Sequence, residues 1–149
     1  MTSKDKIVFN FNGDMLALDL EAIDSIVEVE HISLIPYSPV FLNGIISLHG
    51  EVITVIDIPV LFETTWESQE PPYKVVISKM NGTYMGFYIG KARISFLWNE
   101  RIGKMKLRKE KEKYIIGVIE SDDTVIKIID WDFLLKLTTE ALSKGYQLF

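Results

Sequence analysis

The sequence predicts a mainly β protein built as two small β-barrels that pack against each other. Three observations support this fold class. Apolar and polar side chains alternate along much of the chain, which is the period of a strand. Asn-Gly pairs at residues 12–13 and 81–82 each join two such stretches, and a tight type I′ hairpin turn needs positive φ at both central residues. Finally, "VITVID" at 52–57 is matched by "VIKIID" at 125–130, so one structural pattern is expected to occur twice.

The first half begins with a predicted hairpin over residues 6–19. A short amphipathic helix of about two turns is expected next, within residues 21–29. Its apolar residues recur at helical spacing: Ala22, Ile23, Ile26 and Val27. Pro36 and Pro39 then rule out a central strand and predict an extended connector, because proline cannot donate to a strand ladder.

Two apolar strands are predicted at residues 43–48 and 51–58, with His49-Gly50 between them. Glycine adopts positive φ at no steric cost, and histidine is one of the few other residues enriched there. His49 is therefore expected at the tip of a second hairpin.

The second half repeats this order. Its first hairpin covers residues 73–90, and a second strand pair turns at Asp122-Asp123. Residues 91–98 take the place of the short helix, and the mixed charges of 99–114 predict a solvated connector. A C-terminal helix is predicted over 132–145, with Asp132 as N-cap and Gly145 as its end.

These elements fit one domain, residues 1–149, in which two pseudo-repeated subdomains share a core. We expect the subdomains at approximately 6–68 and 69–137, because residues 63–73 form the most linker-like stretch of the chain.

Charge and composition remove several classes of function. The net charge of −5 gives no positive field to attract a phosphate backbone, so nucleic-acid binding is not expected. Cysteine is absent, which excludes disulfides and thiolate chemistry. The N-terminus lacks the apolar region of an export signal, and a cytoplasmic location is expected. The apolar run 44–62 contains charged residues, so membrane insertion is not expected either.

No cofactor, metal or catalytic site is predicted. His31 and His49 are the only histidines, and neither is accompanied by the three or four ligands that a metal needs. Asp57 and Asp130 end equivalent strands. Reading them as a catalytic carboxylate pair would require them to meet in one cleft, whereas their place in the repeat favours the same structural role twice.

Several motifs resemble those of the CheW-like family, the coupling proteins of bacterial and archaeal chemotaxis. The matching residues of the most recognisable motif are Pro39, Phe41, Gly44, Ile45, Ile46, Leu48, Gly50 and Glu51, followed by "VITVIDI". The stretch at 16–29 and the stretches "YMGFYIGKARIS" and "IKIIDWDFLL" also resemble the family, so the likeness covers about residues 6–137. The chain departs from the family at His49, where the family has arginine, and at Ser47, where it has asparagine.

The resemblance implies two SH3-like five-stranded barrels and a non-enzymatic adaptor. Such an adaptor bridges the regulatory domain of a chemotaxis histidine kinase to the cytoplasmic tip of chemoreceptors, and its partners recruit it to membrane receptor arrays. The positions implied in partner binding are Ile23, Ile26 and Gly44, which match a receptor groove, and His49, which replaces the arginine. Phe41 and Asn43 are added because they adjoin Gly44.

Other readings remain open at this point. Ile23 and Ile26 are also explained as core residues of an amphipathic turn, and Gly44 as a strand or bulge glycine. His49 and Ser47 favour a diverged adaptor with another signalling partner. A small-molecule-binding or hydrolytic barrel would instead show an internal polar pocket with a carboxyl group of raised pKa.

Overall fold

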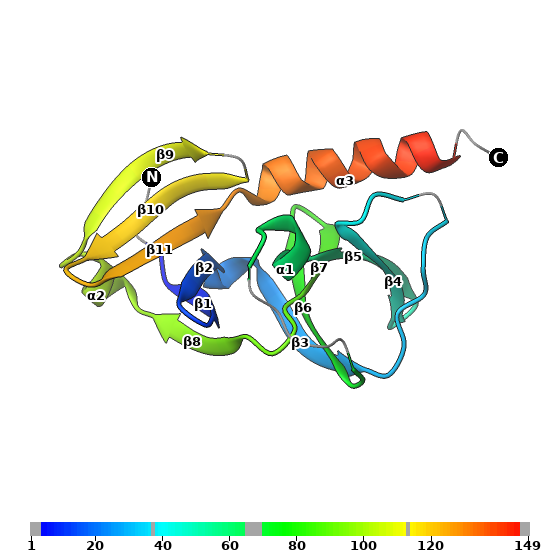
Figure 1. The fold of residues 1–149 in the computed structure, drawn as a ribbon, viewed down its shortest axis with the longest axis horizontal. Helices are drawn as coiled ribbons and strands as arrows, with labels where there is room; N and C mark the ends of the chain where they lie inside the picture. Colours follow the sequence, from blue (N-terminus) through cyan, green and yellow to red (C-terminus); the bar gives the residue numbers. More distant parts are fainter. Residues whose placement is uncertain (1–3, 37, 65–69, 113, 147–149) are drawn as a thin grey trace. The chain divides into compact units, whose positions relative to one another are not determined.

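The computed structural model describes residues 4–36, 38–64, 70–112 and 114–146. Two compact units make up the chain (Figure 1). The first unit comprises Met1–Ala22 and Ala92–Leu134, and the second comprises Ile23–Lys91 and Leu135–Phe149. Each unit contains one mixed β-sheet, so the predicted mainly β class is confirmed.

The sheet of the first unit has six strands in the order β8-β1-β2-β11-β10-β9. Their bounds are β1 Lys6–Phe11, β2 Asp14–Asp19, β8 Arg93–Leu97, β9 Lys106–Glu112, β10 Ile115–Ser121 and β11 Thr124–Ile129. The strand β9 and the short helix α2 (Asn99–Ile102) lie where a connector was predicted. This stretch was predicted to be a solvated connector because of its charges. It is ordered as a helix and a strand because its apolar residues pack on the core of the sheet, namely Ile102, Met105 and Leu107. The sheet therefore has six strands where five were expected.

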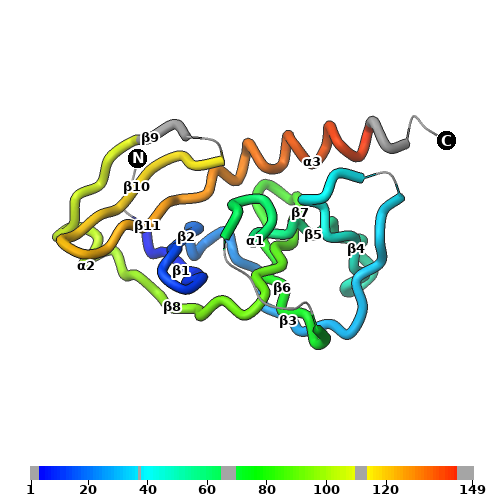
Figure 2. Tube along the Cα trace, viewed as in Figure 1, coloured from blue at the N-terminus to red at the C-terminus, as the bar shows by residue number. Residues whose placement is uncertain are grey.

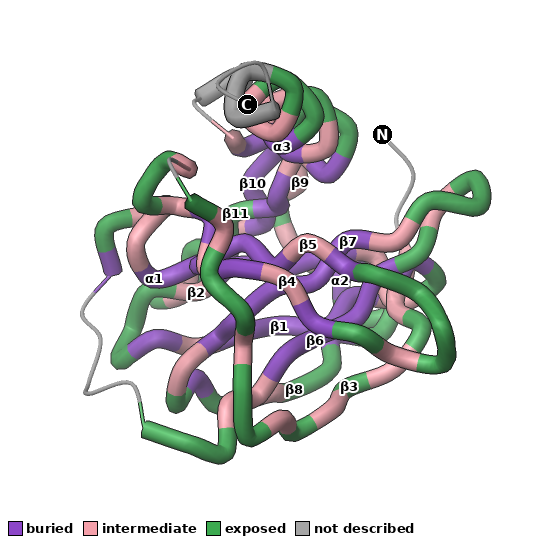
Figure 3. The backbone as a smooth tube through the Cα atoms, turned by 90° about the vertical axis from the view of Figure 1, so that its right-hand side faces the viewer, coloured by how far each residue is buried: buried purple, intermediate pink, exposed green. Residues whose placement is uncertain are grey.

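The sheet of the second unit has five strands in the order β3-β6-β7-β5-β4. Their bounds are β3 Ile23–Val29, β4 Leu42–Leu48, β5 Glu51–Asp57, β6 Tyr73–Met80 and β7 Thr83–Tyr88. A short helix α1 (Ile58–Leu61) follows β5. The core residues on one face of this sheet are Ile46, Ile53, Val55, Val75, Ile77 and Tyr88. Burial is continuous along the inner strands and alternates along the edge strand β3 (Figure 3).

The two sequence halves are interleaved between the units. The chain leaves the first sheet after β2 and enters the second at β3, then returns after β7 to place β8 beside β1 (Figure 2). Parallel pairing completes each sheet, with β5 beside β7 and β11 beside β2. Each sheet therefore draws strands from both of the predicted subdomains, 6–68 and 69–137.

The short helix predicted after the first hairpin is a strand. Only Leu20–Ala22 is helical, as a single 3₁₀ turn, and β3 begins at Ile23. A register shift between Ile23 and Ser25 marks a bulge in the pairing of β3 with β6. Because a bulge adds one residue to one strand, Ile23 and Ile26 are paired with Ser78 and Val76, which share one face of β6. The bulge thus gives a strand the three-residue spacing that indicated a helix.

All four predicted hairpin turns and the C-terminal helix are present. Asn12, His49 and Asn81 have φ values of 55°, 50° and 51°. The helix α3 spans Trp131–Tyr146, one residue longer at each end than predicted. Its first turn is capped by Asp130, whose Oδ1 accepts from the Phe133 N–H at 3.1 Å, so Asp130 takes the role expected of Asp132.

Candidate functional site

The six residues that sequence analysis singled out all belong to the second unit. Ile23 and Ile26 lie on the edge strand β3, and the bulge directs both to the same face. Ile26 is 42% exposed, whereas Ile23 is partly buried. Ile26 is therefore an apolar side chain presented to solvent on an edge strand, and it is not a core residue.

His49 is exposed at the tip of the β4–β5 hairpin, as predicted. Beside it on β5, Val52 is 69% exposed and lies directly opposite Ser47 on β4. Its neighbours Ile53 and Val55 are buried. Sequence analysis did not select Val52, although strict alternation along β5 would have placed it on the outer face.

Gly44 has a structural role in β4. It is buried, has φ of +149° and follows a register shift after Leu42. The segment beyond β3 crosses here, because Ser33 and Ile45 exchange backbone hydrogen bonds of 2.9 and 2.8 Å. A Cβ on Gly44 would overlap the Ser33 carbonyl and the Ile32 side chain. The close approach that glycine permits is therefore to this protein's own backbone.

Phe41 and Asn43 hold the carboxyl end of β5. The Asp57 N–H donates to the Phe41 carbonyl oxygen at 2.7 Å. The Asn43 Nδ2 donates to Asp57 Oδ2 at 3.0 Å, and the Val60 N–H donates to Asp57 Oδ1 at 3.1 Å. Asp57 is only 2% exposed, and these bonds compensate for the burial of its carboxylate.

Asp130 makes the equivalent bonds in the first unit. Its N–H donates to the Tyr114 carbonyl oxygen at 2.7 Å, and its carboxylate caps α3 as Asp57 caps α1. Both residues thus connect a strand to the helix that follows. This repeated structural role is the one predicted for them, and it accounts for both carboxylates without catalysis.

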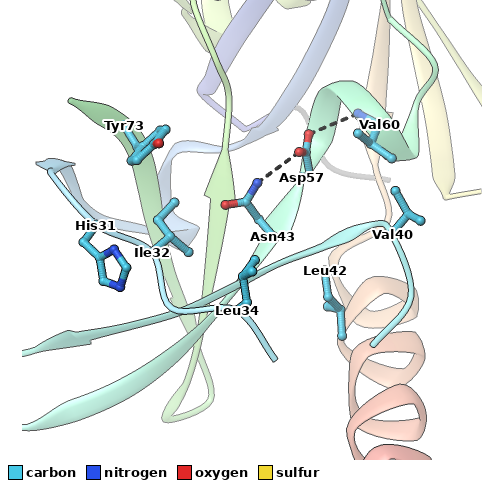
Figure 4. A pocket seen from close by; sticks show the side chains of 9 residues that line it. All are labelled: His31, Ile32, Leu34, Val40, Leu42, Asn43, Asp57, Val60 and Tyr73. Atoms are coloured by element: carbon cyan, nitrogen blue, oxygen red, sulfur yellow. Dashed lines mark hydrogen bonds between the residues drawn. The ribbon is translucent and has the colours of Figure 1, made fainter. Parts of the chain in front are cut away.

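A cavity of about 400 Å³ opens beside Asn43 and Asp57 in the second unit (Figure 4). Aliphatic side chains form its walls: Ile32, Leu34, Val40, Leu42 and Val60. Polar groups come from His31, Asn43, Asp57 and Tyr73. The sequence motifs did not reveal this cavity, because its lining is assembled from the β3–β4 connector, three strand ends and α1.

Two tyrosine side chains, Tyr73 and Tyr88, lie near Asp57. Burial raises the pKa of the Tyr88 hydroxyl above its ordinary value, and the negative charge of Asp57 raises it further. The Tyr73 ring packs edge-on against Tyr88, with centroids 6.0 Å apart and planes at 73°. The cavity is thus lined by the buried carboxylate of Asp57 and by Tyr73, which packs on Tyr88.

Two further properties bear on the kind of site. Among the residues that the structure describes, no three His, Cys, Asp or Glu side chains are grouped so as to hold a metal ion. In the same part of the chain, no helix has the length and apolar character needed to cross a membrane.

The sequence of this chain matches a known protein family. The family model described as the CheW-like domain matches residues 5–139. The chain belongs to the CheW-like family. It is 20% identical over 132 residues to the chemotaxis protein CheW of Thermotoga maritima, a match that covers 88% of this chain and 87% of that protein.

A solved structure confirms the CheW-like fold. The scaffolding protein TtCheW from Thermoanaerobacter tengcongensis matches with a TM-score of 0.71 at 23% identity, covering 88% of this chain and 91% of that one. Of the six residues predicted to bind partners in this CheW-like chain, Ile26 and His49 are exposed. Gly44 and Asn43 have the structural roles described above.

Proposed function

We propose that this protein is a chemotaxis scaffold that couples chemoreceptors to the regulatory domain of a histidine kinase. The observation that carries the proposal is the CheW-like match over residues 5–139, which includes every strand described above. The roles of the two relatives named above, a chemotaxis protein and a scaffolding protein, agree with it. The protein performs no chemistry in this role, since it acts by holding its partners in a fixed arrangement.

The six selected residues divide into two groups in this proposal. Ile23 and Ile26 contact the cytoplasmic tip of the receptor, with Ile26 as the apolar anchor because its side chain is exposed. His49 contacts a partner from the hairpin tip. Phe41, Asn43 and Gly44 act indirectly, because they fix the start of β4 and the end of β5 through Asp57 and Ser33.

The exchange of arginine for histidine at position 49 makes the proposal testable. Arginine is always charged and offers a planar fork of donors, whereas neutral histidine offers one donor. We would titrate the protein with the regulatory domain of its own organism's chemotaxis kinase by calorimetry, alongside His49→Arg and His49→Ala. One-to-one binding is expected, strengthened by arginine and weakened roughly fivefold by alanine, as for loss of one hydrogen bond.

The matched control is Asn81→Ala, because Asn81 occupies another hairpin tip of the same unit at φ of 51°. It introduces the same backbone strain as His49→Ala and is expected to leave the affinity unchanged. Absence of binding by every folded variant would contradict the proposal.

A second candidate is a diverged CheW-like adaptor that serves another signalling partner. His49 is the observation that favours it, since a partner that requires the arginine fork would not bind this chain. The same titration separates the two candidates. Binding by His49→Arg without binding by the native protein would indicate the diverged adaptor.

A further inference from the structure

The cavity beside Asp57 has the chemistry of a ligand site that the scaffold role does not use. Its volume of about 400 Å³ lies within the range of small-molecule sites, which combine apolar walls with a few fixed polar groups. The described residues that line it all belong to the second unit, where they come from strand ends of the sheet, the β3–β4 connector and α1.

The polar end of the cavity is fixed in one orientation. Because the Asn43 Nδ2 donates to Asp57 Oδ2, the amide oxygen Oδ1 is turned away from Asp57, toward the side where Ile32 and Tyr73 lie (Figure 4). The Val60 N–H holds the other carboxylate oxygen. The cavity therefore presents a hydrogen-bond acceptor supported by a buried negative charge, with a tyrosine ring at its border.

The lining favours a cation over an anion. Among the residues that the structure describes, it includes the carboxylate of Asp57 and no lysine or arginine. A buried carboxylate attracts a positive charge more strongly than an exposed one does, because water screens it less. The aliphatic residues Leu34 and Val40 lie at the exposed rim of the cavity, being 84% and 80% exposed.

We propose that this cavity binds a small aliphatic amine in its protonated form. The ammonium group donates to Asn43 Oδ1 in the field of Asp57, and the alkyl chain lies along Leu34 and Val40. This proposal does not rest on the coupling function, so either proposal can fail without the other. Occupancy would also hold the β3–β4 connector, which forms one wall of the cavity, against the start of β4.

The test is a titration of the whole chain with n-hexylammonium chloride as the probe. Binding is measured by NMR, from the chemical shifts of the backbone and side-chain amides at constant ionic strength. Saturable shifts are expected at His31, Tyr73 and the Asn43 side-chain amide. n-Hexanol has the same chain without the charge and is expected to bind about tenfold more weakly, as for loss of a charged hydrogen bond. Hexanoate, which is negatively charged, is expected not to bind.

Variants test whether hexylammonium binds in the cavity or elsewhere on the surface. Val40→Lys places a cation at the exposed rim without disturbing the core and is expected to weaken hexylammonium binding at least about fivefold. Val52→Lys is the matched control, because Val52 is a similarly exposed valine outside the cavity, and its binding should equal that of the native protein. Asp57→Asn is expected to reduce the preference for the ammonium over the alcohol.

Three results would overturn the inference. They are equal binding of hexylammonium and hexanol, equal weakening by Val40→Lys and Val52→Lys, and an absence of saturable shifts at the cavity. Tighter binding of Nα-acetyl-lysine amide than of hexylammonium would overturn the small-molecule assignment in favour of a partner's lysine side chain.

Discussion

The backbone of Ser33 occupies the space in which a side chain on Gly44 would begin. The two backbone hydrogen bonds between Ser33 and Ile45 hold the connector against β4 at this point, and they cover the outer edge of that strand. Gly44 is therefore required for a contact within the chain. Any effect of this glycine on partner binding is expected to act through the connector.

Gly44→Ala is expected to lower the free energy of unfolding by about 3 kcal/mol, because it combines positive φ with a clash against fixed backbone. Gly82→Ala is the matched control: Gly82 also has positive φ, at 78°, but nothing lies within 4 Å of its added Cβ. Gly82→Ala should lower the free energy of unfolding by about 1 kcal/mol, which is the cost of positive φ without a clash. Urea denaturation measures both, and equal losses would contradict the role given to Ser33.

The ion pair between Lys6 and Asp19 in the first unit is expected to stabilise the fold. The Lys6 Nζ lies 2.6 Å from Asp19 Oδ1, and the Lys6 side chain is only 3% exposed. Asp19→Ala leaves a buried ammonium group without its carboxylate, so we expect a loss of about 3 kcal/mol in unfolding free energy. Glu21→Ala removes the partner of the exposed Lys4 and should cost less than about 1 kcal/mol. Thermal or urea unfolding measures the loss of unfolding free energy in each variant. Similar losses in the two variants would refute the expected difference.

Tyr88 is expected to make stability depend on pH in the alkaline range. Its folded-state pKa is raised by burial and by Asp57, so the hydroxyl keeps its proton in the folded protein after the unfolded chain has lost it. Stability is then complete below about pH 10, the ordinary tyrosine pKa, and falls as the pH rises toward the folded-state value. Tyr88→Phe should reduce this alkaline loss. Denaturation curves at several pH values test it, and identical pH dependence in both proteins would count against it.

Ile26 is expected to affect receptor binding more than stability. Ile26→Ala removes an exposed anchor and should weaken binding of a cytoplasmic receptor fragment about tenfold, which corresponds to about 1.4 kcal/mol. Val125→Ala is the control, because Val125 is 48% exposed on the first unit's sheet, away from the selected positions in the sequence. Calorimetry on both variants provides the comparison. An equal loss in the control would indicate that the effect is not specific to β3.

Local sequence signals predicted the turns but not the sheets. Asn12, His49 and Asn81 all adopt the positive φ that their residue types and the following glycines indicate. The pairing partners of β5 and β11 could not be read in this way, because parallel pairing with β7 and β2 joins segments that no turn connects. The repeat was therefore recognised, while its division between the two sheets was not.

Local sequence signals were limited in the same way for the candidate site. The three-residue spacing of Ile23 and Ile26 was correctly read as a shared face, but the face belongs to a bulged strand. Asn43 was selected for its position beside Gly44, whereas its bond to Asp57 depends on the return of β5 along β4. A side chain's burial and partners depend on such distant segments, which residue periodicity does not encode.

The order of strands also determines the order in which the ribosome can complete the two sheets. The strands of the second sheet lie in one continuous stretch, so this sheet has all of its strands once Tyr88 has left the exit tunnel. The β1–β2 hairpin is made first, yet its partners β8 and β11 are among the later strands to be synthesised. Apolar residues such as Ile7 and Phe9 stay without their final neighbours during that interval, and long-range parallel pairing forms slowly. The nascent hairpin thus waits longer for its pairing partners than any strand of the second sheet does.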